Sequence, residues 1–368
     1  MKQSESSKLP SFLKKINLSL ENLRGIPSSE KLFFVQYLGV MIKAGLSLSP
    51  SLKTLAKQTK NKNFKRILLS VQQNIEIGES FSYSLSQHPK VFKELFVNMI
   101  EAGETSGNLE KVLSQLHIQM KKDHDLISKI KGALIYPIIV IIAMIGIGTA
   151  MIVFVIPKIS EVYKEVNATL PLATRALISL SDFVVNNGLM AGTATVILII
   201  LIIKIISTSK GKYQFDRILL KLPIIAPIIK KINLARFART LGSLLKTDIP
   251  VIKSFQITSK VLGNSLYREA VKTTTQDLEK GVSIEETLKK FSHLFPPTVI
   301  QMIATGEQSG TTDEMLENLA NFYEEEVNRT MENLPSVIEP ILIIVLGVAV
   351  AAMAIAIIMP MYSLTQAI

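Results

Sequence analysis

The chain has 368 residues and no cysteine, which excludes a disulfide scaffold, a thiolate metal site and a cysteine nucleophile. Hydrophobic residues make up 48% and the mean hydropathy is +0.34, values too high for an ordinary soluble domain, whereas 19% charged residues are too many for a chain lying wholly in lipid. With a formal net charge of +11, the composition predicts a basic membrane protein with large water-exposed parts.

Residues 1–29 are polar and basic, and they lack the apolar run of a cleavable signal. We expect a flexible basic N-terminal tail here. The alternative is a short amphipathic helix on the membrane surface. Its apolar face would consist of Phe12, Leu13, Ile16, Leu20 and Leu23.

Residues 30–132 have the periodicity of helices, with apolar side chains recurring every three or four positions. Breaks at Gly45, Gly78, His88-Pro89 and Gly103 to Gly107 divide this segment into about six helices. No part of the chain alternates between apolar and polar residues for long enough to predict a sheet. The segment is therefore predicted to be an all-α bundle of its own.

This first module is strongly basic, with 15 basic against 9 acidic residues, and no acidic residue lies between Glu30 and Glu76. Lys53, Lys57 and Lys60 share one helix face. Three further basic residues follow, and the whole basic face is Lys53, Lys57, Lys60, Lys62, Lys65 and Arg66. Such a face suits anionic lipid headgroups or an acidic cytoplasmic partner. Nucleic acid is the weakest interpretation, because the face has no interleaved aromatic residues.

Three apolar stretches are long enough to cross a membrane as helices: residues 133–157, 189–206 and 340–360. Basic residues cluster before the first span and after the second, whereas the connecting segment 158–188 has three basic and three acidic residues. The positive-inside rule then places both polar modules in the cytoplasm. The segment 158–188 and the tail 361–368 are predicted to be extracytoplasmic.

An internal repeat organises the chain. MIEAGETSGNLEKVL, from Met99, aligns with MIATGEQSGTTDEML, from Met302, at an offset of 203 residues. The same offset, without a gap over about 130 residues, pairs Gly78 with Gly281 and further glycines, prolines and phenylalanines. Residues 207–339 therefore form a second cytoplasmic module of about six helices. The fold class is an all-α membrane protein with two duplicated bundles and three transmembrane helices.

The sharpest local signal is a glycine-flanked turn that occurs once in each copy, comprising Gly103, Glu104, Ser106 and Gly107, and Gly306, Glu307, Ser309 and Gly310. Glycine favours the positive φ that ends a helix, and serine can bond back to its own backbone. We interpret the motif as a helix-to-helix turn in which the glutamate meets the positive end of a helix dipole. The alternative is that the two glutamates bind a partner or a cation.

Four prolines mark where the chain enters and leaves the membrane, Pro137 and Pro340 at the entrance and Pro157 and Pro360 twenty residues later. Proline lacks a backbone N–H and pushes the preceding residue out of the helical region. These prolines, with Tyr136, are predicted hinges between each module and its span.

Enzyme signatures are absent. Gly211-Lys212 lacks the earlier glycine of a phosphate loop, the histidines form no zinc motif, and no span carries a central charge. We therefore predict no catalytic residue, no cofactor and no metal site. The duplicated membrane-linked units leave a small transporter or channel as the alternative function.

The sequence resembles the inner-membrane platform proteins of type II secretion systems and type IV pili, the GspF/PilC family, with the competence protein ComGB as a relative. The resemblance covers nearly the whole chain after Glu30. Matching residues are Ala133-Leu134-Ile135-Tyr136-Pro137 before the first span, the two glycine-flanked turns, Gly78 and Gly281, and the terminal Pro157 and Pro360. The second copy departs from the pattern, with Glu339 in place of a tyrosine before Pro340.

The resemblance implies a non-enzymatic scaffold of the cytoplasmic membrane that receives a hexameric motor ATPase on its cytoplasmic side. It also implies pilin or pseudopilin subunits and other inner-membrane assembly proteins as partners, besides membrane lipids, and a homo-oligomer. The machine would be for secretion, pili or competence.

Overall fold

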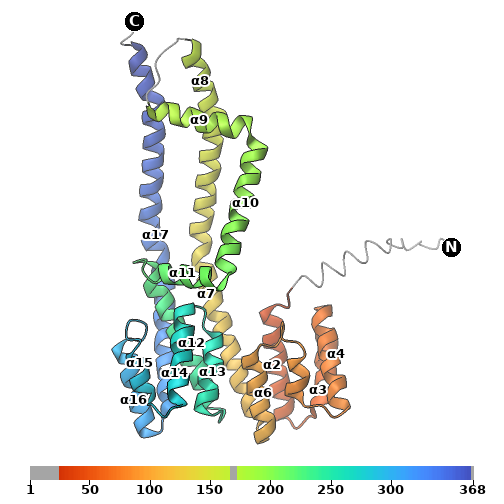
Figure 1. Ribbon diagram of the computed structural model, residues 1–368. Helices are drawn as coiled ribbons and strands as arrows, with labels where there is room; N and C mark the ends of the chain where they lie inside the picture. The colour runs from red at the N-terminus through yellow and green to blue at the C-terminus, as the bar shows by residue number, and fades with distance from the viewer. Residues whose placement is uncertain (1–24, 166–171, 366–368) are drawn as a thin grey trace, which may run out of the picture. The chain divides into compact units, whose positions relative to one another are not determined.

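The computed structural model describes residues 25–165 and 172–365 (Figure 1). Within these ranges every regular element is helical and no strand occurs, which confirms the all-α prediction. Contacts group the chain into two compact units. One consists of the residues up to Asp125 with Lys230–Glu324, and the other of Leu126–Ile229 with the residues from Glu325 on. The predicted N-terminal amphipathic segment falls on residues 1–24, outside the described part.

The first copy of the repeat contains six helices, as predicted. They are α2 (Ser28–Lys43), α3 (Leu48–Gln58), α4 (Lys62–Glu76), α5 (Phe81–Ser86), α6 (Glu94–Ser106) and α7 (Leu109–Ala150). The second copy repeats this order with α12 (Ile225–Leu245), α13 (Val251–Val261), α14 (Ser265–Leu278), α15 (Ile284–Lys289), α16 (Pro297–Ser309) and α17 (Thr312–Thr365). The last helix of each copy is the long one, because it continues from the bundle into an apolar stretch.

Each bundle closes around a cluster of aromatic rings. In the first copy Phe34, Phe64 and Phe92 are fully buried, with ring centroids 5.7 to 6.2 Å apart. In the second copy Phe237 and Phe295, the equivalents of Phe34 and Phe92, lie 5.2 Å apart. Full burial of such side chains contributes about 1.5–3 kcal/mol each. The same inward faces therefore build both copies.

The bends between the helices use matching positive-φ positions. Gly78 (φ 97°) and Gly281 (φ 83°) follow α4 and α14. At the first bend Gly45 (φ 80°) is replaced in the second copy by Asp248, which keeps the left-handed conformation at φ 60°. Aspartate tolerates this region better than most residues, so the bend survives the substitution.

The second unit holds the connector between the copies and most of the apolar residues. It contains the π-helical segment η1 (Met151–Val155) and helices α8 (Ile156–Glu165), α9 (Leu172–Asn186), α10 (Gly188–Ser207) and α11 (Ser209–Leu219). Among the described residues three helical stretches are long and apolar enough to span a membrane, Leu109–Lys158, Gly188–Ser207 and Thr312–Ala352. They overlap the three predicted spans.

The hydroxyl of Ser181 donates a hydrogen bond to a backbone carbonyl that Pro157, which has no N–H, cannot serve. In the π-helical segment the N–H of Ile156 bonds to the carbonyl of Met151, five residues back. The next carbonyl, of Ile152, would accept from residue 157, which is proline and has no N–H. The hydroxyl of the buried Ser181 on α9 donates to that oxygen instead, at 2.5 Å. Helix α9 thus replaces a missing bond of the first apolar stretch.

Candidate functional site

The glycine-flanked turns lie where the sixth helix of each copy begins. Gly107 ends α6 in the left-handed conformation at φ 70°, and Gly310 ends α16 at φ 72°. Ser106 donates its hydroxyl to the carbonyl of Ala102, as Ser309 does to that of Thr305. In both copies a positive-φ glycine thus lies between the fifth helix and the sixth.

The first glycine of each turn allows two helices to touch. A Cβ added at Gly103 would lie 3.0 Å from the Val112 side chain and 3.3 Å from the Leu109 Cα. At Gly306 the added Cβ would lie 2.8 Å from the Cα of Thr312, closer than real Cβ contacts. The sixth helix of each bundle therefore packs directly on the backbone of the fifth.

The glutamate of each turn was expected to interact with the helix that follows the turn, but it bonds to the start of an earlier helix, α5 or α15. The Oε1 and Oε2 atoms of Glu104 accept the backbone N–H groups of Phe81 and Ser82, at 2.5 and 2.8 Å, at the start of α5. Glu307 accepts the N–H of Ile284 at 3.1 Å at the start of α15. An anion is stabilised at a helix N-terminus, so these carboxylates cap α5 and α15 rather than the helix that follows them.

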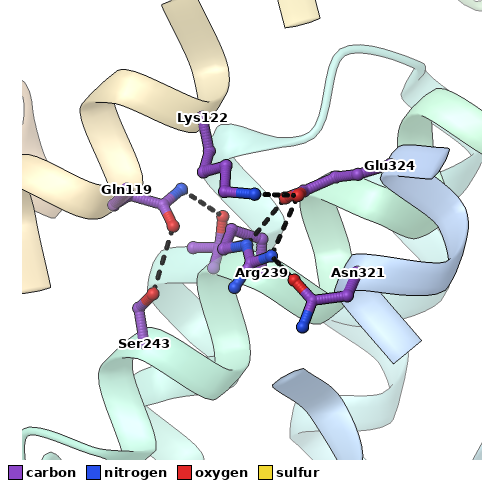
Figure 2. Close-up of polar contacts among 7 residues, drawn as sticks. Gln119, Lys122, Arg239, Ser243, Asn321 and Glu324 are labelled. Atoms are coloured by element: carbon purple, nitrogen blue, oxygen red, sulfur yellow. Dashed lines mark hydrogen bonds and ion pairs between the residues drawn. The ribbon is translucent and has the colours of Figure 1, made fainter. Parts of the chain in front are cut away.

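A polar network joins the two copies within the first unit (Figure 2). Gln119 of α7 donates from Nε2 to the hydroxyl of Thr240 at 3.2 Å, and its Oε1 accepts from the hydroxyl of Ser243 at 3.2 Å. All three side chains are buried. The NH2 group and the oxygen of the Gln119 side chain thus both have hydrogen-bond partners on α12. These bonds hold α7 of the first copy against α12 of the second.

The same network ties α17 to α7 and α12 (Figure 2). Arg239 donates from Nε and Nη2 to the two carboxylate oxygens of Glu324, at 2.7 and 2.9 Å, and also from Nη2 to Asn321. Lys122 lies 3.0 Å from the same carboxylate. Bidentate arginine–carboxylate pairs fix geometry as well as charge. We name Gln119, Lys122, Arg239, Ser243, Asn321 and Glu324 the inter-repeat clamp.

Sequence reasoning missed the clamp because its residues belong to no motif. The repeat itself held a signal: Arg239 aligns with Gln36 and Glu324 with Lys121, so the clamp residues are not duplicated. More exposed ion pairs support the contact between the copies, including Arg236–Asp123 at 3.1 Å and Lys253–Glu101 at 3.0 Å. Such exposed pairs contribute little each.

A polar cavity of about 730 Å³ lies within the first unit. Its lining carries both signs of charge and few apolar groups, and consists of Gly107, Asn108, Glu110, Lys111, Ser114, Gln115, Leu245, Lys246, Asp248 and Asp313. Small-molecule sites are mostly apolar with a few polar groups, so this lining does not have their character. In the described part of the chain no three histidine or acidic side chains are grouped as a metal site requires.

The predicted hinge residues lie inside long helices. Pro137 is within α7, preceded by the exposed Tyr136. Pro157 is the second residue of α8, which follows the π-helical segment, and such segments frequently mark functional positions in helices. Pro340 and Pro360 both lie within α17. Their role as hinges stays a prediction.

The predicted basic face is solvent-exposed. None of its basic side chains is packed in the core. The exposed residues are Lys53 and Lys57 on α3, Lys60 in the following loop, and Lys62, Lys65 and Arg66 on α4. This is the arrangement that either a lipid-facing or a partner-facing surface requires, and its occupant stays a prediction.

A comparison with known protein families decides the identity. The family described as "Type II secretion system (T2SS), protein F" matches the chain twice, at residues 34–157 and 237–360. The chain belongs to this protein F family. The two matches begin and end 203 residues apart (237 − 34 and 360 − 157), which confirms the repeat and its register.

Curated relatives of this protein F family member extend over most of its length. The type IV pilus assembly protein PilC of Thermus thermophilus is 34% identical over 348 residues, 93% of this chain and 84% of the relative. PilC of Myxococcus xanthus is 31% identical over 96% of this chain and 84% of the relative. The type II secretion system protein F of Aeromonas hydrophila is 30% identical over 93% and 88%. This chain is thus a membrane protein of the secretion and pilus machinery family.

Proposed function

We propose that this protein F family member is a non-enzymatic platform of the cytoplasmic membrane that couples a cytoplasmic motor ATPase to the assembly of pilin-like subunits. One observation carries the proposal: the last helix of each bundle continues without a break into an apolar stretch. α7 runs from Leu109 to Ala150, and α17 from Thr312 to Thr365. A displacement of either bundle would therefore pass along a helix into the lipid.

The inter-repeat clamp supports this role. It connects α7 with α17 through Lys122, Glu324 and Arg239, shortly before both helices become apolar. Two helices held together at this point would move together when the bundles move. A scaffold needs this mechanical property, whereas an enzyme would need a reactive constellation.

The proposed orientation places the N-terminus and both bundles in the cytoplasm and residues 158–188 and the C-terminus outside. In this scheme 30–132 and 207–339 are the two cytoplasmic modules. The basic face on α3 and α4, with Lys53 and Lys57, would meet the motor ATPase or anionic lipid headgroups. Pilin or pseudopilin subunits and other assembly proteins would be met in the membrane.

Deletion of the gene tests the function directly. We expect pilin-like subunits to remain in the membrane as monomers, with no pilus, secretion or DNA uptake, while the motor ATPase still hydrolyses ATP. The full-length gene restores assembly. Normal assembly of every such filament in the deletion strain would refute the proposal.

The basic face gives a second test. Charge reversal at Lys53, Lys57 and Lys60 should weaken binding of either the motor ATPase or anionic vesicles, whereas reversal at the exposed Lys272 on α14, outside the basic face, serves as the control. If neither association changes, the face is only solvated.

The alternative function, a small transporter or channel, rests on the duplicated membrane-linked units. Solute flux through liposomes that contain the purified full-length protein would favour it over the platform. We expect no flux above that of empty liposomes, because the predicted spans carry no central charged residue.

A further inference from the structure

The contact between the two copies is one-sided. The first copy contributes α7, through Gln119 and Lys122, and the second copy contributes α12 and α17, through Thr240 and Glu324. If the copies were related by a two-fold axis, the equivalent residues shifted by 203 would meet as well. Phe322 is the equivalent of Gln119, and Tyr37 that of Thr240. Both are exposed, at 57% and 43%, so the contact is head-to-tail and leaves one face open on each copy.

The open face of the first copy corresponds to the surface that receives α7 in the second. Shifted by 203 residues, Arg236, Thr240 and Ser243 become Phe33, Tyr37 and Val40 of α2, and Asn321 becomes Ile118 of α7. These four are exposed, and the rings of Phe33 and Tyr37 lie 4.1 Å apart. We name Phe33, Tyr37, Val40, Ile118 and Lys121 the α2 face. It is apolar where its counterpart is polar.

The open face of the second copy has matching chemistry. On α17 the exposed Phe322 replaces Gln119, and Glu325, three residues further along the helix, replaces Lys122. The Lys122–Glu324 ion pair thus maps onto Glu325 and Lys121, with the two charges exchanged. If the two surfaces met, Phe322 would face the apolar α2 face, and the Lys121 cation would face the Glu325 carboxylate. Both substitutions keep the two faces complementary to each other.

We propose that the α2 face of one copy of this chain binds the Phe322–Glu325 surface of a second copy, repeating between molecules the contact that joins the two halves within one. The occupant is a second copy because of the repeat: the α2 face is equivalent to the α12 surface that receives α7, and the Phe322–Glu325 surface of α17 is equivalent to the part of α7 that it receives. Contiguous exposed apolar side chains, such as Phe33, Tyr37 and Val40 of the α2 face, mark interaction sites. The contact does not depend on whether the chain assembles pilins.

Site-directed crosslinking in membranes tests the contact. Because the chain has no natural cysteine, only the introduced cysteines of this protein can react. Two full-length copies with different tags are co-expressed, one carrying Tyr37→Cys and the other Phe322→Cys, and treated with a short bismaleimide. We expect a product with both tags, at least tenfold above that of a control pair with Ile77→Cys, which is 79% exposed outside the α2 face. Lys253→Cys with Glu101→Cys in one chain controls for the reach of the reagent.

Charge exchange tests the register of the contact. Lys121→Glu should reduce the Tyr37–Phe322 product severalfold, and combining it with Glu325→Lys in the other copy should restore the product. Glu325 also pairs with Arg329 on its own helix, an exposed pair whose loss costs little. Folding is checked by the Lys253–Glu101 crosslink, which neither change touches.

Two results would overturn the proposal. One is a Tyr37–Phe322 product no more abundant than the Ile77 control. The other is an intrachain product between Tyr37→Cys and Leu20→Cys in place of the intermolecular one, which would assign the α2 face to the N-terminal segment of the same chain.

Discussion

Arg239 and Glu324 form a bidentate ion pair between α12 and α17, with Nε–Oε1 at 2.7 Å and Nη2–Oε2 at 2.9 Å. Their side chains are only 9% and 13% exposed. The pair is therefore more shielded than other ion pairs of the described chain, such as Arg329–Glu325, whose side chains are 67% and 59% exposed. It is the centre of the contact that holds α7, α12 and α17 together.

Removal of one partner should strongly destabilise the protein. Arg239→Ala leaves the Glu324 carboxylate in a shielded site with Lys122 alone, and we expect a loss of about 3 kcal/mol. Thermal unfolding of the detergent-purified full-length protein measures it. Replacement of both partners, Arg239→Met with Glu324→Leu, should recover most of the loss because no charge is left uncompensated. Arg329→Ala should cost less than about 1 kcal/mol. Equal effects of Arg239→Ala and Arg329→Ala would contradict the account.

Alanine should not be tolerated at the first glycine of either turn. Gly306→Ala places a Cβ 2.8 Å from backbone, whereas Gly103→Ala meets the Val112 side chain, which can shift. We expect both to lower the unfolding temperature, Gly306→Ala more than Gly103→Ala. Gly132→Ala on α7 has open space and should stabilise by about 0.5–1 kcal/mol. A stabilising effect at Gly306 would show that the helices are not in direct contact.

Loss of the glutamate caps should destabilise the fifth-helix region of each copy. Glu104→Ala leaves the N–H groups of Phe81 and Ser82 without an acceptor, at a cost of about 1–2 kcal/mol. Glu307→Ala should cost less, because its bonds are longer. Faster hydrogen exchange at residues 81–84 and 284–287 checks the location. Glu79→Ala, at an exposed neighbouring position, is the control and should leave these rates unchanged.

The bond from Ser181 should matter only while residue 157 is proline. Ser181→Ala leaves the Ile152 carbonyl without a donor, and we expect a loss of about 1 kcal/mol. Pro157→Ala supplies an N–H to the same segment, so Ser181→Ala should have little effect in that background. A double-mutant cycle on thermal unfolding measures the coupling. Additive effects of the two substitutions would contradict this explanation.

The sequence predicted the features that depend on local chemistry. The glycine turn at Gly107 follows from the preference of glycine for the positive φ that ends a helix. The role of Glu104 was not predictable, because its helix partner lies 23 residues earlier in the chain. The clamp was missed for the same reason: the Arg239–Glu324 pair joins residues 85 positions apart that no spacing rule connects.

Helices α8 and α9 of the connector also escaped prediction. Helix α9 is held by a tertiary bond from Ser181 to a carbonyl that becomes available only through Pro157 and the π-helical turn. The repeat, in contrast, was predictable in full register, because an offset of 203 residues pairs Gly78 with Gly281 and the two glycine-flanked turns with each other without a gap.

In the proposed function an unbroken helix couples each cytoplasmic bundle to the membrane. Substituting Lys129, Ile130 and Lys131 of α7 by glycine creates a four-glycine stretch with Gly132, and glycine weakens a helix by about 1 kcal/mol per residue relative to alanine. The matched variant carries alanine at the same three positions. Filament assembly is measured for both variants in the deletion strain, after equal membrane insertion and ATPase binding are verified. We predict assembly with the alanine variant and none with the glycine variant; equal assembly by both would contradict the account.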